Sequence, residues 1–395
     1  MLEKRIVFTG WGAVTPKGLE NQDFAESISK RAFSFSSDHS WTKYDIGDIY
    51  FGQIPAIDIS KYLPMKAPFP NQLSSIAMKA CINALHDANL YESDLLDNTG
   101  LIITNTLGPS AEIQNFLTTL FTKGPDRLSP FNFSKATSNS VLGDVSRAFK
   151  IKGPSSFVYG EESVVYGIDL IRNGHCDIVI CGGVDEIKEL TLFNLEKKKK
   201  AVEATGASMQ EDMMNADNKN IFSESAGFVV IETLESALKR NAKIYGEIID
   251  YHSYMDSTSS YTIFERDAEE LRFNVEKILQ NNEIKKEASI NILGTSCLPW
   301  QIKKYEFMAL KPLPYKFNYS NIKLLLGEGL SGFSNLNVIA PFVTEPYKPS
   351  EYVSIEDIPH NISLGVTPDH ENSFTLVHNY SLGGNNTVLL LKKYQ

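Results

Sequence analysis

The stretch Gly153–Glu186, GPSSFVYGEESVVYGIDLIRNGHCDIVICGGVDE, decides how this chain folds. Its apolar pattern predicts a strand over Ser156–Tyr159 and a tight turn at Gly160. An amphipathic helix then opens at Glu161 or Glu162, and a buried strand follows the helix. A strand that turns sharply into a helix gathers unpaired backbone N–H groups at one point, where a pocket is expected. Two acids in a first helical turn are also explained by stabilisation of the helix alone.

The rest of the chain alternates strands with helices. Strands are predicted over Lys4–Gly10, Gly100–Thr104, Ile178–Cys181, Tyr245–His252, Ser289–Leu293 and Thr387–Lys392. Helices are predicted over Gln72–Leu90 and Asp267–Gln280. The strand over Ile178–Cys181 is expected to end in a turn at Gly182-Gly183. This alternation indicates a sheet covered by helices, and it recurs after Tyr245 without repeated sequence. We therefore predict an α/β chain of two halves, residues 1–245 and 246–395.

Composition limits the classes of partner. The chain has 395 residues, enough to bury a substantial core, and a formal net charge of −10. This charge argues against nucleic acid or an anionic membrane as the main partner, and the basic run Lys197–Lys200 is interpreted as solvated. The four cysteines have no metal-type pairing with histidines, and Cys81 and Cys181 fit small core residues. With no apolar run of membrane-spanning length and no signal peptide, we expect a reduced cytoplasmic location.

Several motifs, in order, resemble the β-ketoacyl synthase family. The opening KRIVFTGWGAVTPKG is similar to the start of these enzymes, and FSESAGFVVIETLESALKR places Glu224 and Gly227 in register with a family motif. Counting forward from Gly153 puts the family's catalytic cysteine on Glu162, whereas counting back from the later glycines allows Glu161. The resemblance implies a thiolase-like α/β fold, in which two fused halves give a five-layered αβαβα arrangement.

Three more landmarks of the family lie in the second half. The segment LGTSC stands where a synthase has His-Gly-Thr, so Leu293 occupies the position of the first catalytic histidine. In KLLLGEGLSG the family lysine persists as Lys323, and the second histidine is replaced by Glu328. The C-terminal loop Ser381–Asn386, SLGGNN, keeps the glycine pair and loses the family's gating Gly-Phe pair. The resemblance therefore implies that the cysteine and both histidines are gone.

These replacements remove the chemistry of condensation. A cysteine at a helix N-terminus becomes a thiolate that accepts an acyl group, whereas a glutamate there is a poor nucleophile toward a thioester. Leucine at position 293 can neither donate a hydrogen bond nor exchange a proton. Glu328 would place negative charge where negative charge develops during the reaction, which is the wrong sign for stabilisation. We expect a catalytically inactive subunit.

The pattern is similar to the chain-length factor of type II polyketide systems, or to the equivalent subunit of aryl-polyene pathways. It implies a heterodimer with an active ketosynthase, whose acyl tunnel this subunit helps to shape. It also implies transient contact with an acyl carrier protein whose phosphopantetheine arm reaches the partner, and no cofactor, metal or nucleic acid on this chain. Chain-length factors commonly carry glutamine at the cysteine position, so the glutamate here leaves the subfamily and the product open.

Two other functions stay open: a carrier-linked malonyl decarboxylase and a stand-alone acyl-binding homodimer. Decarboxylases of this family replace the cysteine but keep the histidines, so Leu293 argues against the first. A synthase with an intact Cys-His-His set encoded alongside would argue against the second. The seven histidines lack catalytic motif context and are interpreted as surface or structural residues: His39, His86, His175, His252, His360, His370 and His378.

The resemblance also indicates a tunnel wall and a subunit interface. The helix predicted over residues 111–124 carries one apolar stripe: Ile113, Phe116, Leu117, Leu120 and Phe121. The stripe is either an ordinary core face or a tunnel wall in which Phe116 or Leu120 limits tunnel length. The stretch that precedes the elbow is expected to pack against another subunit, with Ser134, Asn139 and Phe157 at the interface.

Lys323 is the one retained member of the family's catalytic set. Isolated charge in a water-poor pocket is costly unless it is paired, so Lys323 is predicted to neutralise a buried carboxylate, either Glu328 or Glu162. In the alternative, the shell of the site is open and all three residues are solvated.

Overall fold

The computed structural model describes residues 4–38, 49–63, 70–160, 163–188, 191, 221–256, 266–296, 301–344, 358–365, 374–381 and 383–394. Several sequence-predicted residues lie outside these ranges: His39, Glu161, Glu162, Lys197–Lys200, Cys297 and His370. The strands are β1 (Ile6–Val14), β2 (Ser36–Asp38), β3 (Ile49–Gly52), β4 (Gly100–Asn105), β5 (Ser155–Tyr159), β6 (Ile178–Asp185), β7 (Phe222–Ser223), β8 (Ser225–Thr233), β9 (Gly246–Met255), β10 (Ser289–Leu293), β11 (Lys316–Ser320), β12 (Ile362–Leu364), β13 (Phe374–Asn379) and β14 (Asn385–Lys393).

The helices alternate with these strands. They are α1 (Asn21–Ser29), α2 (Gln72–Asp87), α3 (Ser110–Lys123), α4 (Pro130–Lys135), α5 (Ser140–Phe149), α6 (Ser163–Arg172), α9 (Leu234–Lys239), α10 (Ala268–Asn281), α12 (Met308–Leu310), α13 (Lys323–Leu326) and α14 (Leu330–Val343). Short helical segments are η2 (Ile59–Lys61), η3 (Asp94–Asp97), η4 (Pro125–Arg127) and the π-helical η5 (Ile302–Phe307).

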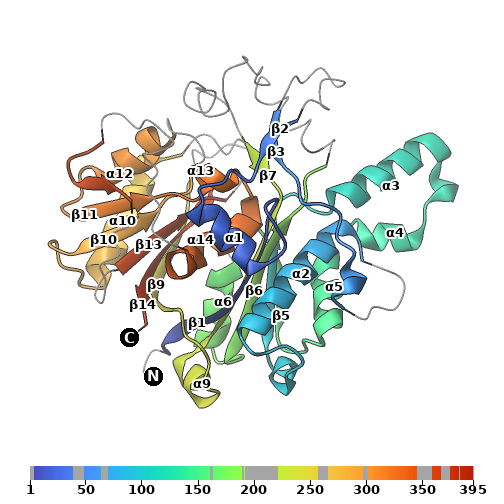
Figure 1. The fold of residues 1–395 in the computed structure, drawn as a ribbon, viewed down its shortest axis with the longest axis horizontal. Helices are drawn as coiled ribbons and strands as arrows, with labels where there is room; N and C mark the ends of the chain where they lie inside the picture. The colour runs from blue at the N-terminus through green and yellow to red at the C-terminus, as the bar shows by residue number, and fades with distance from the viewer. Residues whose placement is uncertain are drawn as a thin grey trace.

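Eleven strands form one ladder in the order β12-β11-β10-β13-β14-β9-β1-β8-β6-β4-β5 (Figure 1). The same arrangement of five strands occurs twice in the ladder. We call the two copies the first half-sheet (β5-β4-β6-β8-β1) and the second half-sheet (β11-β10-β13-β14-β9). In each, two parallel pairings are followed by two antiparallel ones. Ile6–Phe8 of β1 pairs with Gly246–Ile248 of β9 and joins the half-sheets. The domain division at residue 245 stays a prediction.

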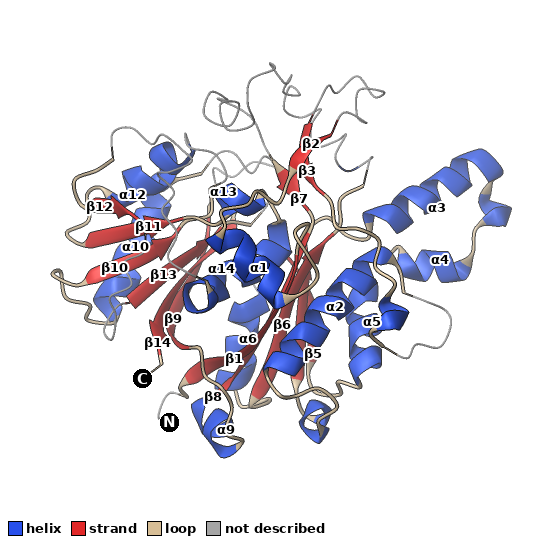
Figure 2. Ribbon diagram, in the orientation of Figure 1, coloured by secondary structure: helices blue, strands red, loops and turns tan. Residues whose placement is uncertain are grey.

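Alternate residues of each half-sheet face two different cores. On β8, Phe228 and Val230 pack outward with α2 and α5, whereas Val229 and Ile231 face a central core that contains α6 and α14. Strand β14 alternates in the same way between the central core and a second outer core built with α10 and α12 (Figure 2). The layers therefore run helix, sheet, helix, sheet, helix. This confirms the predicted five-layered α/β arrangement.

Strand β6 corrects one prediction. The expected turn at Gly182-Gly183 is wrong, because β6 continues through both glycines to Asp185. A Cβ atom on Gly182 would lie 2.3 Å from the Phe228 ring, and one on Gly183 would lie 2.0 Å from the Ser331 carbonyl oxygen. The glycines therefore permit close approach of a ring and of α14 rather than a change of chain direction.

Helices α3 and α4 project from the body as an arm, residues 110–135 (Figure 1). The interpretation of the α3 stripe as an ordinary core face is wrong, since Ser110 is the only buried residue of this helix. The ring of Phe116 packs on that of Phe133 in α4, with centroids 5.8 Å apart, and Phe121 is 80% exposed. The described chain therefore leaves an apolar helical face largely uncovered.

Candidate functional site

The site is built where two neighbouring parallel strands end. Strands β10 and β11 are paired in parallel with Leu293 opposite Ser320, so the segments that follow them meet at one edge of the sheet. The carboxyl ends of parallel strands are the usual place for binding sites in α/β proteins. Leu293 itself is 3% exposed and belongs to the central core. The residue predicted to stand at the position of the family's first histidine is thus a buried aliphatic group.

The predicted ion pair is present, and its partner is Glu328. Lys323 opens α13, and Gly327, at a φ of 76°, ends this short helix in a left-handed conformation. Lys323 Nζ lies 2.5 Å from Glu328 Oε1, and the two side chains are 1% and 6% exposed. The alternative in which both groups are solvated is wrong. Glu162 lies outside the described residues.

The surroundings of this pair combine a hydroxyl, a backbone N–H and an aromatic ring. Lys323 Nζ lies 3.4 Å from Thr295 Oγ1 and 4.7 Å from the centre of the Phe333 ring. Glu328 Oε1 also accepts a hydrogen bond from the Leu330 N–H at 3.4 Å. The pair is internally neutral and buried, so its lysine does not act as a free cation and its carboxylate does not act as a free base.

Glu306 is a buried site residue that the sequence did not reveal. Its Oε1 accepts hydrogen bonds from the N–H groups of Thr295 and Ser296, at 3.1 and 2.8 Å, and its Oε2 accepts one from Tyr319 OH at 2.5 Å. Burial and the nearby Glu306 carboxylate raise the pKa of Tyr319 well above its usual value. Glu306 therefore fixes the loop that follows Leu293. The only sequence signal was an acid between two aromatic residues, Tyr305 and Phe307, in η5.

His378 is buried in β13 and has a structural partner. One ring nitrogen, Nε2, lies 2.8 Å from Tyr254 OH. Burial, with the positive charges of Arg266 and Lys323, holds the pKa of His378 well below its usual value, so the ring is neutral. This agrees with the structural interpretation of that histidine.

The strand and the helix on either side of the predicted elbow are present, whereas the predicted start of the helix at Glu161 or Glu162 lies outside the described residues. Strand β5 ends at Tyr159, Gly160 has a φ of 101°, and α6 begins at Ser163. The Gly160 carbonyl accepts a hydrogen bond from Ser331 Oγ at 2.8 Å, and Ser163 Oγ donates to Asn335 Oδ1 at 2.8 Å. Both partners belong to the start of α14, which directly follows Glu328. The elbow and the ion pair therefore lie at the same end of α14.

The predicted tunnel and interface residues gather on one side of the first half-sheet. Phe116 and Leu120 lie on α3, Ser134 lies on α4, and Asn139 precedes α5. Phe157 lies on β5, the terminal strand of the ladder, which pairs with β4 on one side. Phe116, Leu120 and Phe157 are partly exposed, and Ser134 and Asn139 are exposed. Their roles in a tunnel wall and a subunit interface stay predictions.

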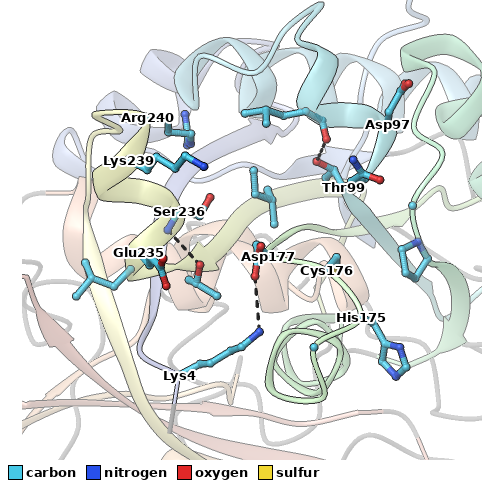
Figure 3. A pocket seen from close by; sticks show the side chains of 18 of the residues that line it. Lys4, Asp97, Thr99, His175, Cys176, Asp177, Glu235, Ser236, Lys239 and Arg240 are labelled. Carbon is cyan, nitrogen blue, oxygen red and sulfur yellow. Dashed lines mark hydrogen bonds and ion pairs between the residues drawn. The ribbon is translucent and has the colours of Figure 1, made fainter. Parts of the chain in front are cut away.

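A hollow lies around the amino ends of β4, β5 and β6, at the edge of the sheet opposite the carboxyl ends of these strands (Figure 3). Its volume is about 1260 Å³ and its rim carries charges of both signs. Lys4 Nζ lies 3.6 Å from Asp177, as Figure 3 shows, and Lys152 lies 2.7 Å from Asp97. Because these charges are already paired, the hollow has no convergent set of one sign that would select a charged ligand.

The described cysteines do not replace the missing nucleophile. Cys81, Cys176 and Cys181 are buried, which confirms the prediction for Cys81 and Cys181. Burial raises the pKa of all three thiols, so they are not thiolates at neutral pH. Within the part of the chain that the structure describes, no cluster of His, Cys, Asp and Glu could hold a metal ion. None of the described helices combines the length and the apolar character needed to cross a membrane.

Comparison with known proteins gives concordant results. Among curated proteins, the 3-oxoacyl-[acyl-carrier-protein] synthase 2 of Synechocystis sp. is 26% identical over 420 residues, which cover 100% of this chain and 99% of the relative. The protein of the same name from Rhizobium meliloti is 27% identical, with 99% of each chain covered.

Among solved structures, the ishigamide ketosynthase/chain length factor has a TM-score of 0.83 at 20% identity, with 100% of both chains covered. A type II acyl-carrier protein in complex with its ketosynthase, bound to the hexaketide, has a TM-score of 0.79 at 19% identity and the same coverage. These likenesses confirm the thiolase-like fold. Residues 3–237, well over half of the chain, match the family profile described as the β-ketoacyl synthase N-terminal domain. The chain therefore belongs to the β-ketoacyl synthase family.

Proposed function

We propose that this chain is a non-condensing β-ketoacyl synthase-like subunit, a chain-length factor. In this role it pairs with an active ketosynthase and shapes the acyl tunnel in polyketide or polyene biosynthesis. The observation that carries the proposal is the buried Lys323–Glu328 ion pair, together with the burial of Leu293. The resemblance assigns these three residues to the positions of the family's lysine and two histidines.

The chemistry of this pair argues against condensation. Decarboxylative condensation needs donors that stabilise an enolate as its negative charge develops. Glu328 is a buried anion whose charge is already matched by Lys323 at 2.5 Å, and Leu293 offers no donor. A neutral, closed pair can hold the scaffold together while another chain supplies the nucleophile and the donors.

The arm and the edge strand support a partner subunit. Strand β5 ends the ladder, so one of its edges carries backbone groups that a strand of another chain can pair with. The arm carries the apolar face of α3 and the exposed ring of Phe133, and soluble proteins seldom leave such a surface uncovered. In the heterodimer, Phe116 and Leu120 would line the growing chain. The phosphopantetheine arm of a carrier protein would enter through the ketosynthase, in the cytoplasm.

A direct assay tests the absence of condensation chemistry. The purified chain is incubated with an acyl-carrier and a malonyl-carrier substrate, and a 3-oxoacyl-carrier synthase of the same family serves as the positive control. We expect no acyl adduct by intact-mass spectrometry and no carrier-dependent release of carbon dioxide. Carbon dioxide release would favour the malonyl decarboxylase instead.

Assembly is tested by co-expression with a ketosynthase that has the Cys-His-His set and is encoded beside this chain. Native mass spectrometry should detect a one-to-one heterodimer. A stable homodimer that binds acyl groups and ignores the ketosynthase would favour the acyl-binding alternative, and a monodisperse monomer would contradict both.

A further inference from the structure

The carboxyl end of β6 holds the loop from which the arm begins. Asn105 Nδ2 donates to the Val184 carbonyl at 2.8 Å. Asp185 Oδ1 accepts hydrogen bonds from the N–H groups of Thr106 and Leu107, at 2.9 and 2.8 Å. Successive residues of β6 therefore fix the chain that leads from β4 into α3.

Glu186, the residue that follows β6, continues this anchorage into the helix itself. Glu186 Oε1 accepts a hydrogen bond from the Ala111 N–H at 3.0 Å, and the Glu186 carbonyl accepts one from Ser110 Oγ at 3.1 Å. Helix α3 starts at Ser110, and its N-cap residue, Pro109, offers no side-chain cap, so Glu186 supplies an acceptor that the helix lacks. The base of the arm is thus anchored on one short stretch.

The second oxygen of Asp185 reaches the other half of the molecule. Asp185 Oδ2 accepts a hydrogen bond from the Ser331 N–H at 3.0 Å, in the first turn of α14. Ser331 Oγ lies 2.8 Å from Thr106 Oγ1 and also donates to the Gly160 carbonyl at the elbow. Its neighbour Leu330 has a φ of 49°, a left-handed conformation that an L-residue adopts only when its surroundings enforce it. One carboxylate therefore joins the arm, the elbow and the end of α14 that carries Glu328.

The chemistry of this junction requires a carboxylate. Asp185 is fully buried, and its two oxygens meet three backbone N–H donors. A carboxylate only accepts, whereas an asparagine amide would direct its own N–H groups at one of these donors. Negative charge is also favourable at the amino end of α14.

We infer that Asp185 is a positioning residue that couples the α3–α4 arm to the start of α14, so that an event at the arm is transmitted to the elbow and to the Lys323–Glu328 pair. The coupling runs through hydrogen bonds with discrete partners around a fully buried carboxylate, where loss of one contact forces the others to rearrange. The identity of that event rests on the proposed function, in which a ketosynthase covers the arm.

Hydrogen exchange of the full-length chain tests the coupling without a partner. In Asp185→Asn, amide exchange should rise about tenfold in residues 105–111 and in residues 329–334 together. Thr106→Val, which removes only the Thr106–Ser331 hydroxyl contact, should produce a smaller joint rise. The control is Asp87→Asn, because Asp87 is a partly buried carboxylate that likewise accepts a backbone N–H, from Trp11, and a tyrosine hydroxyl. It should leave both segments unchanged.

The inference is overturned if amide exchange rises only in residues 105–111, and not in residues 329–334, in both Asp185→Asn and Thr106→Val. A second measurement, with the ketosynthase added, separates this result from the proposed function. Ketosynthase binding should slow amide exchange at residues 329–334 in the wild-type chain, and the slowing should be at least about threefold smaller in Asp185→Asn. If no ketosynthase binds at all, the proposed function fails, while joint exchange in the free chain still supports the coupling. If the ketosynthase binds and protects residues 329–334 equally in both chains, the coupling through Asp185 is wrong.

Discussion

The crossover from β4 to β5 and the crossover from β10 to β11 hold equivalent places in the two half-sheets, yet they face opposite surroundings. The first projects outward as α3 and α4, where the only buried residue is Ser110, before it returns to the body through α5, one face of which is buried. The second contains η5 and α12, where Ile302, Tyr305, Glu306, Phe307 and Leu310 are all buried. The same strand order therefore carries an exposed arm in the first half-sheet and a buried segment in the second.

This difference indicates that the two crossovers have different roles, one in association and one in stability. The outward crossover presents apolar rings to a partner, whereas the inward crossover delivers Glu306 to the loop after Leu293. Substitutions in the inward region should change the stability of the chain, and substitutions on the arm should change association. The predictions below test this division, from the largest expected effect to the smallest.

The largest effect should come from Lys323→Met. Removing one partner of a buried pair leaves an uncompensated charge and typically costs about 3–5 kcal/mol. The matched control is Lys152→Met, because the Lys152–Asp97 pair is formed by side chains that are 61% and 54% exposed and should contribute about 1 kcal/mol or less. Urea unfolding at neutral pH measures both. Equal midpoints for the two variants would show that the Lys323–Glu328 pair is not a buried interaction.

An intermediate effect should come from Glu186→Gln, at the base of the arm. Burial, reinforced by Glu224 and Glu112 and opposed by the Ala111 N–H and Lys188, raises the pKa of Glu186 to about 7 from an ordinary 4.5. The folded state therefore binds this proton more tightly than the unfolded state, and the resulting stability is present below pH 4.5 and lost as the pH rises through about 7.

Glutamine keeps the acceptor for Ala111 and does not titrate. Relative to wild type, Glu186→Gln should therefore gain on the order of 1–3 kcal/mol between pH 4 and pH 8. Unfolding curves at the two pH values measure the gain, and Glu235→Gln on exposed α9 provides a surface control. A constant difference across this range would mean that Glu186 is ionised in the folded state throughout.

The smallest effect on stability should come from Phe121→Ser. The ring is 80% exposed, so the free energy of unfolding of the isolated chain should change by less than about 0.5 kcal/mol. The dissociation constant for the ketosynthase should nevertheless rise about tenfold or more, as for an aromatic residue at the centre of an interface. Phe273→Ser on α10, another exposed ring, is the control, and titration calorimetry measures both. Equal affinities would place the partner elsewhere.

The sequence predicted most elements because their periodicity reports burial directly. Strand β10 was predicted with its observed bounds, and α2 and α10 differ by a few residues at their ends. Gly182-Gly183 was misinterpreted because a glycine pair signals either a turn or a close approach, and only the position of Phe228 and α14 decides between them. The α3 stripe was ambiguous for a related reason, since a helical period reveals an apolar face but not what covers it.

Within the site, chemistry predicted more than pattern did. The cost of isolated charge predicted that Lys323 would pair with Glu328 or Glu162, and the structure contains the first of these pairs. Glu306 and Asp185 escaped notice because their partners are backbone N–H groups far away in the chain, and a sequence carries no mark of which N–H groups will be left without acceptors.

The short pairing of Ile6–Phe8 with Gly246–Ile248 bears on whether either half-sheet can fold on its own. Helix α14, which follows β11 in the chain, packs against β6 and β8 of the first half-sheet as well as β13 of the second. A nascent chain that has emerged only as far as Tyr245 therefore displays an inner face whose cover has not yet been made. The two half-sheets share one strand arrangement, but neither has a complete core of its own. The molecule is therefore expected to fold and unfold as one cooperative unit.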